Sequence, residues 1–265
     1  MEEKRMCTVT VDGAEYAYPH GTPFRAVAAD FQDRYPCDIL LVNRDGKLCE
    51  LHKALDRDCS LKMVTALDRP GIQTYERSAV FLMLKAFYDV AGRENVERVS
   101  VEYSLSSALF ILAKGGFTLD QALLEKVEAR MRELSAAALP IEKKTLNTDD
   151  AIDLFREARL VHKAQLLSFR INSHVNVYSL DGFVDYFYGY MAPDTGYIRC
   201  FGLEPFENGF VLRLPTQKDP GHLGDFKPSY KVFRELYQST LRFEALNASN
   251  VAELNTTISQ GGAMP

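Results

Sequence analysis

The residues best suited to chemistry lie in one aromatic stretch, VDYFYGYMAPDTG, at residues 184–196. It places three tyrosines and one phenylalanine around a glycine, with Asp185 as a carboxylate beside them. In a strand the tyrosines face one side, and Asp185, Phe187 and Met191 face the other. Three interpretations are open: a ligand pocket, a platform for stacking bases, and a buried strand. We favour core packing, with the tyrosines against a helix at residues 78–90.

The histidines, cysteines and serines show no spacing typical of a catalytic or metal site. No two of the five histidines are three or four positions apart: His20, His52, His162, His174 and His222. The five cysteines contain no CxxC pair, and no GxSxG surrounds the serines at 104, 106 and 107. We therefore expect no local metal motif and no serine nucleophile, and we expect free thiols in a reducing cytoplasm.

The composition is that of a globular protein without a nucleic-acid-binding field. The chain has 265 residues, of which 46% are hydrophobic and 25% charged, and its formal net charge is -5. RNA binding would therefore need a local basic patch. The candidate basic side chains alternate with acids, which favours plain solvated faces: Lys126, Arg130, Arg132, Lys143, Lys144, Arg213, Lys218 and Lys227. We predict no signal peptide, no membrane span and a cytoplasmic location.

The first part of the chain predicts a small α+β domain. Alternating β-branched residues predict strands at 7–11 and 15–18, joined by an Asp12-Gly13 turn. A helix over about residues 24–32 follows. Three more strands are predicted at residues 39–43, 47–51 and 60–64. Two strands, a helix and three strands are typical of a β-grasp, the ubiquitin-like fold.

A second α+β region is predicted after a linker at residues 67–71. Its helices are expected at residues 78–90, 118–138 and 228–243, with a helix pair over about 149–167 and strands at 98–103, 108–113 and across 172–214. Thr118 and Gln121 form a capping box, and apolar residues follow at helical spacing in the same helix. Asn250 and Glu253 are predicted to begin a last short helix.

These segments resemble known domains. Residues 7–64, with VDG and YPHGT, resemble a TGS domain, the β-grasp module of threonyl-tRNA synthetases, certain GTPases and stringent-response enzymes. Residues 75–214, with RSAVFL, EKVEARMREL and VDYFYGYM, resemble the editing domain of threonyl-tRNA synthetase. The implied fold is α+β, with a TGS-like domain at 1–66, an editing-like domain at 67–225 and a C-terminal helical segment at 226–265.

A narrower resemblance concerns the stretches YFYGYMAPDTGYIRCF and GFVLRLP. They are similar to the N-terminal half of bacterial TGS-containing nucleoside (uridine) kinases. The resemblance implies a C-terminal kinase domain that uses ATP and magnesium. No GxxxxGK[ST] phosphate loop occurs in these 265 residues, so the kinase domain is not in this chain.

The same resemblance locates a degenerate editing pocket. The family's HxxxH pair falls on Arg77 and Phe81, and its CxxxH pair falls on Phe187 and Met191. These side chains lack the imidazole or thiolate lone pair that holds a metal or orients water. The resemblance therefore implies no catalytic residue and no metal-binding residue in this chain. The positions that would still line the pocket are Tyr103, His174, Asp185 and Lys85, with Asp185 pairing with Arg77 or Lys85.

Two functional hypotheses follow from the resemblance. In the first, the chain is the non-catalytic regulatory region of a nucleoside kinase, with RNA (tRNA-like) or the kinase domain as partner and with oligomer formation left open. In the alternative, it is a free-standing deacylase that edits mischarged tRNA.

Overall fold

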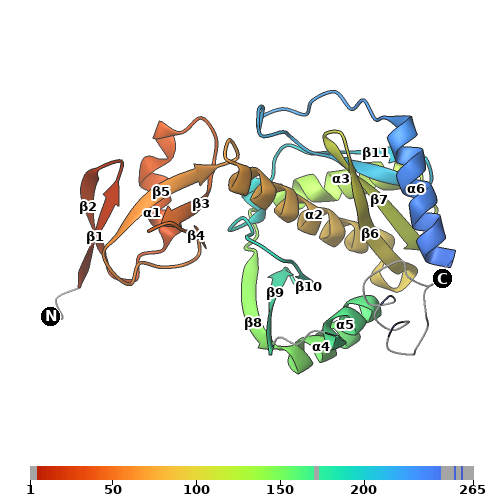
Figure 1. Ribbon diagram of the computed structural model, residues 1–265, viewed down its shortest axis with the longest axis horizontal. Coiled ribbons are helices and arrows are strands. Elements are labelled where there is room, and N and C mark those ends of the chain that lie inside the picture. Colours follow the sequence, from red (N-terminus) through yellow and green to blue (C-terminus); the bar gives the residue numbers. More distant parts are fainter. Residues whose placement is uncertain (1–4, 170–172, 246–253, 255–257, 259–265) are drawn as a thin grey trace. The chain divides into compact units, whose positions relative to one another are not determined.

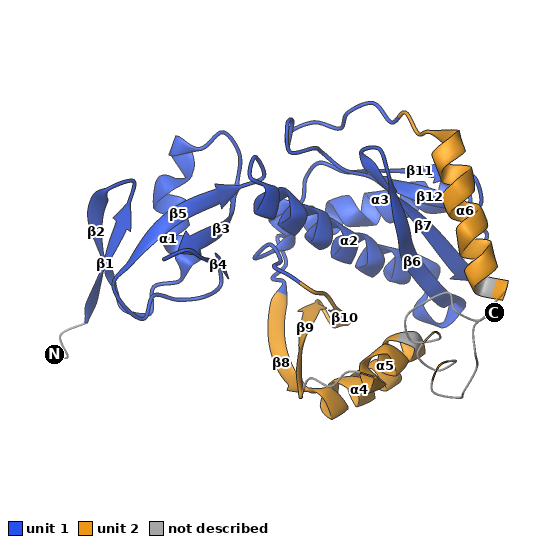
Figure 2. Cartoon of the chain, viewed as in Figure 1, with its two compact units in different colours: residues 1–141, 189–226 blue, residues 142–188, 227–265 orange. Residues whose placement is uncertain are grey.

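The computed structural model describes residues 5–169, 173–245, 254 and 258. The chain is divided into two compact units, residues 1–141 with 189–226, and residues 142–188 with 227–265 (Figure 2). In the described part of the chain the strands form three sheets, two in the first unit and one in the second (Figure 1). The fold is therefore a mixed α+β one, as the sequence predicted.

The N-terminal part of the first unit is a five-stranded sheet with one helix. Its elements are β1 (Met6–Val11), β2 (Ala14–Pro19), α1 (Phe24–Phe31), the 3-10 turn η1 (Gln32–Arg34), β3 (Ile39–Arg44), β4 (Lys47–Glu50) and β5 (Cys59–Thr65). The strand order is β2-β1-β5-β3-β4, and β1 is parallel to β5. The predicted order of two strands, a helix and three strands is confirmed.

Both hairpins of this sheet turn on an Asp-Gly pair. The φ angle is 50° at Asp12 and 82° at Gly13, and it is 50° at Asp45 and 85° at Gly46. Positive φ at both central residues is the conformation that fits the twist of two-residue hairpins, and Asp-Gly adopts it readily. The two turns predicted from the sequence are therefore present.

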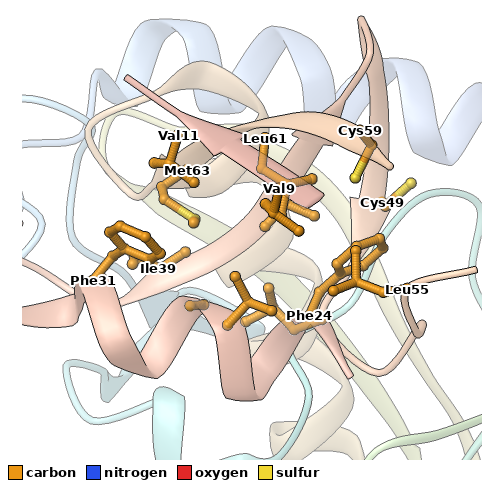
Figure 3. Close-up of a cluster of buried hydrophobic side chains, with 14 of the residues drawn as sticks. Val9, Val11, Phe24, Phe31, Ile39, Cys49, Leu55, Cys59, Leu61 and Met63 are labelled. Carbon is orange, nitrogen blue, oxygen red and sulfur yellow. The ribbon is translucent and has the colours of Figure 1, made fainter. Parts of the chain in front are cut away.

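The core of this part lies between α1 and the sheet (Figure 3). Phe24, Val27 and Phe31 recur at helical spacing and are at most 1% exposed. Alternate residues of β1 point into the same core. Three free thiols are buried there, those of Cys7, Cys49 and Cys59.

Helix α2 (Arg69–Ala91) begins earlier than predicted. Residues 67–71 are not a linker, because the helix already includes Arg69, and Pro70 occupies its first turn, where its missing N–H is not needed. A Cβ on Gly71 would lie 1.9 Å from the carbonyl oxygen of Thr65, so the backbones of α2 and the end of β5 are in close contact. The second half of α2 is buried on nearly all sides, as expected for a helix this apolar.

The rest of the first unit is a four-stranded antiparallel sheet beside α2 and α3 (Gln121–Ala136). Its strands, in the order β11-β12-β7-β6, are β6 (Val96–Leu105), β7 (Ala108–Gly115), β11 (Gly202–Phe206) and β12 (Gly209–Arg213), with 3-10 turns η2 (Arg93–Asn95) and η3 (Thr195–Tyr197). The Phe87 ring of α2 stacks on Phe210 of β12 at 5.8 Å between centroids. The predicted apolar stripe of α3 is confirmed as buried: Leu124, Val127, Met131 and Leu134.

The described residues of the second unit form a three-stranded antiparallel sheet in the order β10-β9-β8 and three helices. Its elements are β8 (Glu142–Asn147), α4 (Thr148–Glu157), α5 (Val161–Ser168), β9 (His174–Leu180), β10 (Phe183–Tyr186) and α6 (Tyr230–Ala245). Strand β8 was not predicted, and β10 ends at Tyr186, within the aromatic stretch at residues 184–196. The short helix predicted from Asn250 and Glu253 begins outside the described residues.

Candidate functional site

The first-unit positions on which the sequence resemblance puts the editing motif, Arg77, Phe81 and Met191, lie on α2 and on the segment after Tyr188. Arg77 and Phe81 are one turn apart on α2. Phe81 is fully buried, and Met191 is 2% exposed. These two side chains are therefore packed into the protein interior and present no polar atom suited to catalysis.

Hydrogen bonds fasten the segment around Met191 to α2. The Arg77 guanidinium donates to the carbonyl oxygen of Tyr190 at 2.6 Å. The buried Ser78 hydroxyl donates to the carbonyl of Thr74, and it accepts from the backbone N–H of Ala192 at 2.8 Å. Arg77 therefore has a structural partner where the family's motif has an imidazole.

Gly189 is required for this approach. Its φ is 123°, a conformation that side-chain-bearing residues rarely adopt. A Cβ at this position would lie 2.7 Å from the central carbon of the Arg77 guanidinium. Glycine therefore lets the arginine lie directly against the backbone.

Glu50, at the end of β4, was not singled out from the sequence. It is 1% exposed and accepts a hydrogen bond from the backbone N–H of Met191 at 3.0 Å. The imidazole Nε2 of His52 lies 3.9 Å from its other carboxylate oxygen. The signal in the sequence was an acidic residue within an apolar strand pattern, LCEL at residues 48–51.

The second unit holds Phe187, the remaining position predicted from the editing motif. Lys163 of α5 forms an ion pair with Asp185, and its ammonium lies 5.9 Å from the centroid of the Phe187 ring. The Asp185 side chain is 2% exposed and also accepts from the backbone N–H of Tyr186 at 2.6 Å. Asp185 thus pairs with Lys163 and not, as the sequence suggested, with Arg77 or Lys85.

The other predicted lining residues occupy separate places. Lys85 pairs with Asp89 on the same helix at 2.8 Å. Tyr103 is half-buried on β6 in the first unit, and its ring stacks on Phe110. His174 is exposed on β9 in the second unit, with its Nδ1 2.9 Å from the hydroxyl of Ser173. A pocket that they share remains a prediction.

The aromatic stretch does not behave as one continuous strand. Tyr188 follows the end of β10 and is 86% exposed, whereas Asp185 and Met191 are buried. The prediction that the tyrosine side forms core is therefore wrong at Tyr188. An exposed ring of this kind is available for stacking.

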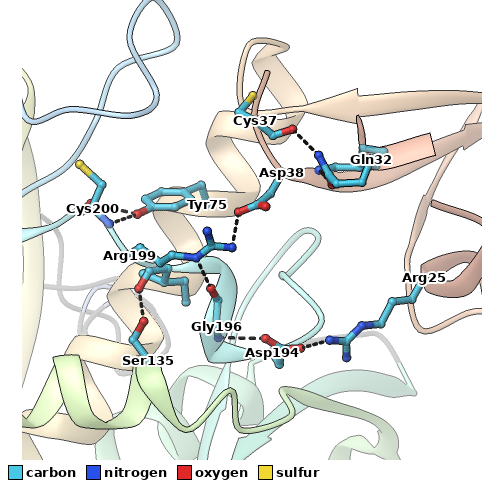
Figure 4. Close-up of polar contacts among 12 residues, drawn as sticks. Arg25, Gln32, Cys37, Asp38, Tyr75, Ser135, Asp194, Gly196, Arg199 and Cys200 are labelled. Atoms are coloured by element: carbon cyan, nitrogen blue, oxygen red, sulfur yellow. Dashed lines mark hydrogen bonds and ion pairs between the residues drawn. The ribbon is translucent and has the colours of Figure 1, made fainter. Parts of the chain in front are cut away.

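Three arginines of the first unit, Arg25, Arg132 and Arg199, form a group that we call the arginine cluster. Arg25 pairs with Asp194 at 2.7 Å and Arg199 with Asp38 at 2.8 Å (Figure 4). Arg132 pairs with Glu128 at 2.6 Å. The arginine side chains are 54%, 56% and 68% exposed, whereas their acidic partners are 4%, 26% and 35% exposed. The positive charge is therefore the outward-facing part of each pair.

Aromatic rings and hollows accompany the arginine cluster. Arg25 lies over the Tyr197 ring at 5.9 Å, and Arg132 lies over the Phe201 ring at 5.1 Å. Arg199 lines a hollow of about 420 Å³ with Tyr75 and Tyr197, and another of about 440 Å³ with Arg132 and Phe201. Cations beside rings and hollows suit a ligand that carries both phosphates and bases.

Burial controls the chemistry of the groups around these hollows. It raises the pKa of the Tyr75 and Tyr197 phenols, which stay neutral hydrogen-bonding groups. Burial also raises the pKa of the Cys200 thiol, which therefore stays protonated rather than becoming an activated nucleophile. Tyr75 donates to the Cys200 carbonyl and accepts from its N–H. Cys200 precedes β11 and is half-buried.

Two further searches of the described residues give negative results. No three or more His, Cys, Asp or Glu side chains of the described part gather closely enough to hold a metal ion. No helix within that part is sufficiently long and apolar to cross a membrane.

The known proteins that the chain resembles, as named here, are threonine–tRNA ligases. No protein-family model matches the chain. It is 28% identical over 198 residues to the threonine–tRNA ligase of Methylococcus capsulatus, and 26% identical over 193 residues to that of Halorhodospira halophila. The chain is similar to threonine–tRNA ligases. The Thermotoga maritima enzyme is 26% identical over 195 residues. Each match covers 72% of this chain, which spans about 30% of the length of these relatives.

Proposed function

We propose that this chain is a tRNA-binding protein with the editing-like fold of threonyl-tRNA synthetases and without their hydrolytic side chains. The observation that carries the proposal is the similarity to threonine–tRNA ligases over 72% of the chain. The residues at the former ligand positions of the first unit support it, because Phe81 and Met191 are buried and Arg77 is bonded to a backbone carbonyl.

The proposal includes the division of the chain. Residues 1–66 would be a TGS-type β-grasp, which the strand order β2-β1-β5-β3-β4 with parallel β1 and β5 supports. Residues 67–225 would be the editing-like domain, and 226–265 a C-terminal segment that contains α6.

The arginine cluster is the proposed contact surface for tRNA. Each guanidinium carries five N–H donors, so pairing with one carboxylate leaves donors for phosphate oxygens. The neighbouring half-buried Tyr197 ring would stack on an unpaired base, such as one at a single-stranded tRNA end. Because the net charge of the chain is -5, binding would be local and sensitive to salt.

Two hypotheses compete with this proposal. A free-standing deacylase would need other acid–base groups, and the buried Glu50 beside His52 is a pair near Met191 that would supply them. Attachment to a nucleoside kinase rests on the sequence resemblance, and the threonine–tRNA ligases that we compared give it no support. A phosphate loop encoded beyond codon 265 would be its test.

The experiment combines binding with hydrolysis. The purified chain is titrated with threonine-specific tRNA at low and moderate salt, and it is incubated with the same tRNA mischarged. We expect binding that weakens with salt and no release of the amino acid above the uncatalysed rate. Turnover that Glu50→Gln abolishes would establish the deacylase instead, and absence of binding at low salt would overturn the tRNA proposal.

A further inference from the structure

Strand β6 is an open edge of the four-stranded sheet in the first unit. In the order β11-β12-β7-β6 it pairs with β7 on one side only. Among the described residues of the first unit, the backbone of Val96–Glu102 makes no hydrogen bond on the other side. The strand has ten residues and contains no proline, glycine or lysine. Its free N–H and C=O groups can therefore pair with another strand.

The two edges of this sheet differ in how they are protected. Strand β11, at the opposite edge, has five residues and includes Pro205, which has no N–H to offer. In β6 the register with β7 shifts between Val96 and Arg98 and again between Val101 and Tyr103. Such irregularities twist a strand and limit pairing at its edge. A strand added to β6 would therefore pair over a short central segment.

A row of polar side chains lies along the centre of β6. Arg98 and Ser100 are on the same side of the strand because side chains alternate. The Ser100 hydroxyl donates to the Glu102 carboxylate at 2.5 Å, which places Glu102 beside them. Arg98 is half-buried and has neither a hydrogen-bond nor an ion-pair partner among the described residues. Because an unpaired buried donor costs free energy, a carboxylate from outside the unit would stabilise Arg98.

A row of valines lies on the other side of the same segment. Val99 is 8% exposed, whereas Val101, two residues further on, is 40% exposed. The segment therefore carries one β-branched side chain that is buried and one that is accessible to a partner.

We propose that two copies of this chain form a dimer through β6, with the two strands antiparallel around a two-fold axis at Ser100. Residues equally far before and after Ser100 then face each other. Arg98 of each copy lies opposite Glu102 of the other, and Val99 lies opposite Val101. Pairs of opposite charge and of β-branched residues stabilise neighbouring strands. The interface is the same patch on both copies, so assembly closes at a dimer. It uses no residue of the arginine cluster and does not depend on tRNA binding.

The charges on β6 favour this register over its neighbours. An axis between Val99 and Ser100 would place Glu97 of one copy opposite Glu102 of the other. Parallel strands in register would place Arg98 opposite Arg98. Like charges directly opposite each other destabilise a strand pair. The axis at Ser100 instead forms two Arg–Glu pairs.

The test is sedimentation equilibrium of the full chain over a range of concentrations. We expect a reversible dimer with a dissociation constant of about 300 µM or lower, which suits a short paired segment. Arg98→Glu and Glu102→Arg each put like charges opposite one another twice in the dimer. Each variant alone should therefore self-associate at least about tenfold more weakly than the wild-type chain.

Mixing the two variants provides the decisive measurement. Arg98→Glu in one copy and Glu102→Arg in the other place two glutamates opposite two arginines, so the mixture should form a heterodimer. The double variant Arg98→Glu, Glu102→Arg should form a homodimer again. Lys62→Glu, at an exposed lysine of β5, changes the net charge as Arg98→Glu does and is the matched control. It should dimerise as the wild-type chain does.

Three results would overturn the proposal. In the first, the wild-type chain remains monomeric at about 300 µM, which would leave β6 without a second copy as its partner. In the second, Arg98→Glu and Glu102→Arg self-associate as strongly as the wild-type chain. In the third, both variants are folded by circular dichroism but their mixture associates no better than either alone.

Discussion

The contact between Gly189 and Arg77 shows how one residue without a side chain positions another. A methyl group at residue 189 would be 2.7 Å from the guanidinium, and φ of 123° is strained for any residue with a Cβ. We predict that Gly189→Ala lowers the free energy of unfolding by about 1–3 kcal/mol. Urea denaturation of the wild-type chain and the variant measures this difference in the free energy of unfolding. Gly224→Ala, at a glycine with no atom within 4 Å of its added Cβ, is the control. Equal stability of the two variants would contradict the contact.

Glu76 predicts how stability depends on pH. Its pKa is raised in the folded chain, so the folded state holds the proton more tightly than the unfolded state. The resulting stabilisation is complete below the unfolded pKa and is lost as pH rises through the raised folded pKa. Glu76→Gln removes this loss, so the variant should gain in Tm relative to the wild-type chain between about pH 4 and pH 7. A difference in Tm that is constant over this range would contradict the effect of burial.

At the scale of elements, the start of α3 distinguishes the predicted cap from the actual one. The sequence suggested Thr118, but the Asp120 carboxylate accepts from the backbone N–H of Leu123 at 2.8 Å. Asp120→Ala should therefore lower the free energy of unfolding by about 1 kcal/mol. Thr118→Ala should change it by less than about 0.5 kcal/mol. Chemical denaturation of both variants decides between the caps, and a larger loss for Thr118→Ala would favour the capping box.

Local patterns were sufficient where an element's own residues determine its structure. The Asp45-Gly46 turn and the apolar stripe of α3 were predicted correctly for that reason. The structure of the aromatic stretch was not predicted correctly. The strand stops at Tyr186, and Gly189 adopts a left-handed conformation against Arg77, which is distant in the chain. Strand β8 is mostly polar, so its pairing with β9 could not be inferred from its own periodicity.

The candidate site was predictable only in part. The sequence located Arg77 on a helix and Met191 on a later segment, but not the hydrogen bond from Met191 to Glu50, which is 141 residues away. Likewise, the arginine cluster combines α1, α3 and the segment before β11. Interactions between distant residues depend on tertiary packing, which a period of two or 3.6 residues does not encode.

At the scale of the whole molecule, an acidic chain that binds RNA must concentrate positive charge in one place. Arg132 and Arg199 line the same hollow, with side chains 56% and 68% exposed. Replacing both with glutamine should weaken tRNA binding and lower the slope of log K against log salt by about 2, since each lost phosphate contact lowers it by about 1. Filter binding at several salt concentrations measures both quantities.

The matched control for this prediction is the pair Arg57→Gln and Arg156→Gln. Both arginines are 65% exposed and bonded to an aspartate, at 3.3 Å and 3.0 Å, so the control changes the net charge by the same amount and also breaks two surface ion pairs. If binding depends on overall charge, the two double variants will weaken it equally, because long-range attraction follows net charge. If the arginine cluster is the contact surface, only the variant with Arg132 and Arg199 replaced will show a smaller slope of log K against log salt. Equal slopes for all three proteins would exclude these two arginines from the contact with tRNA.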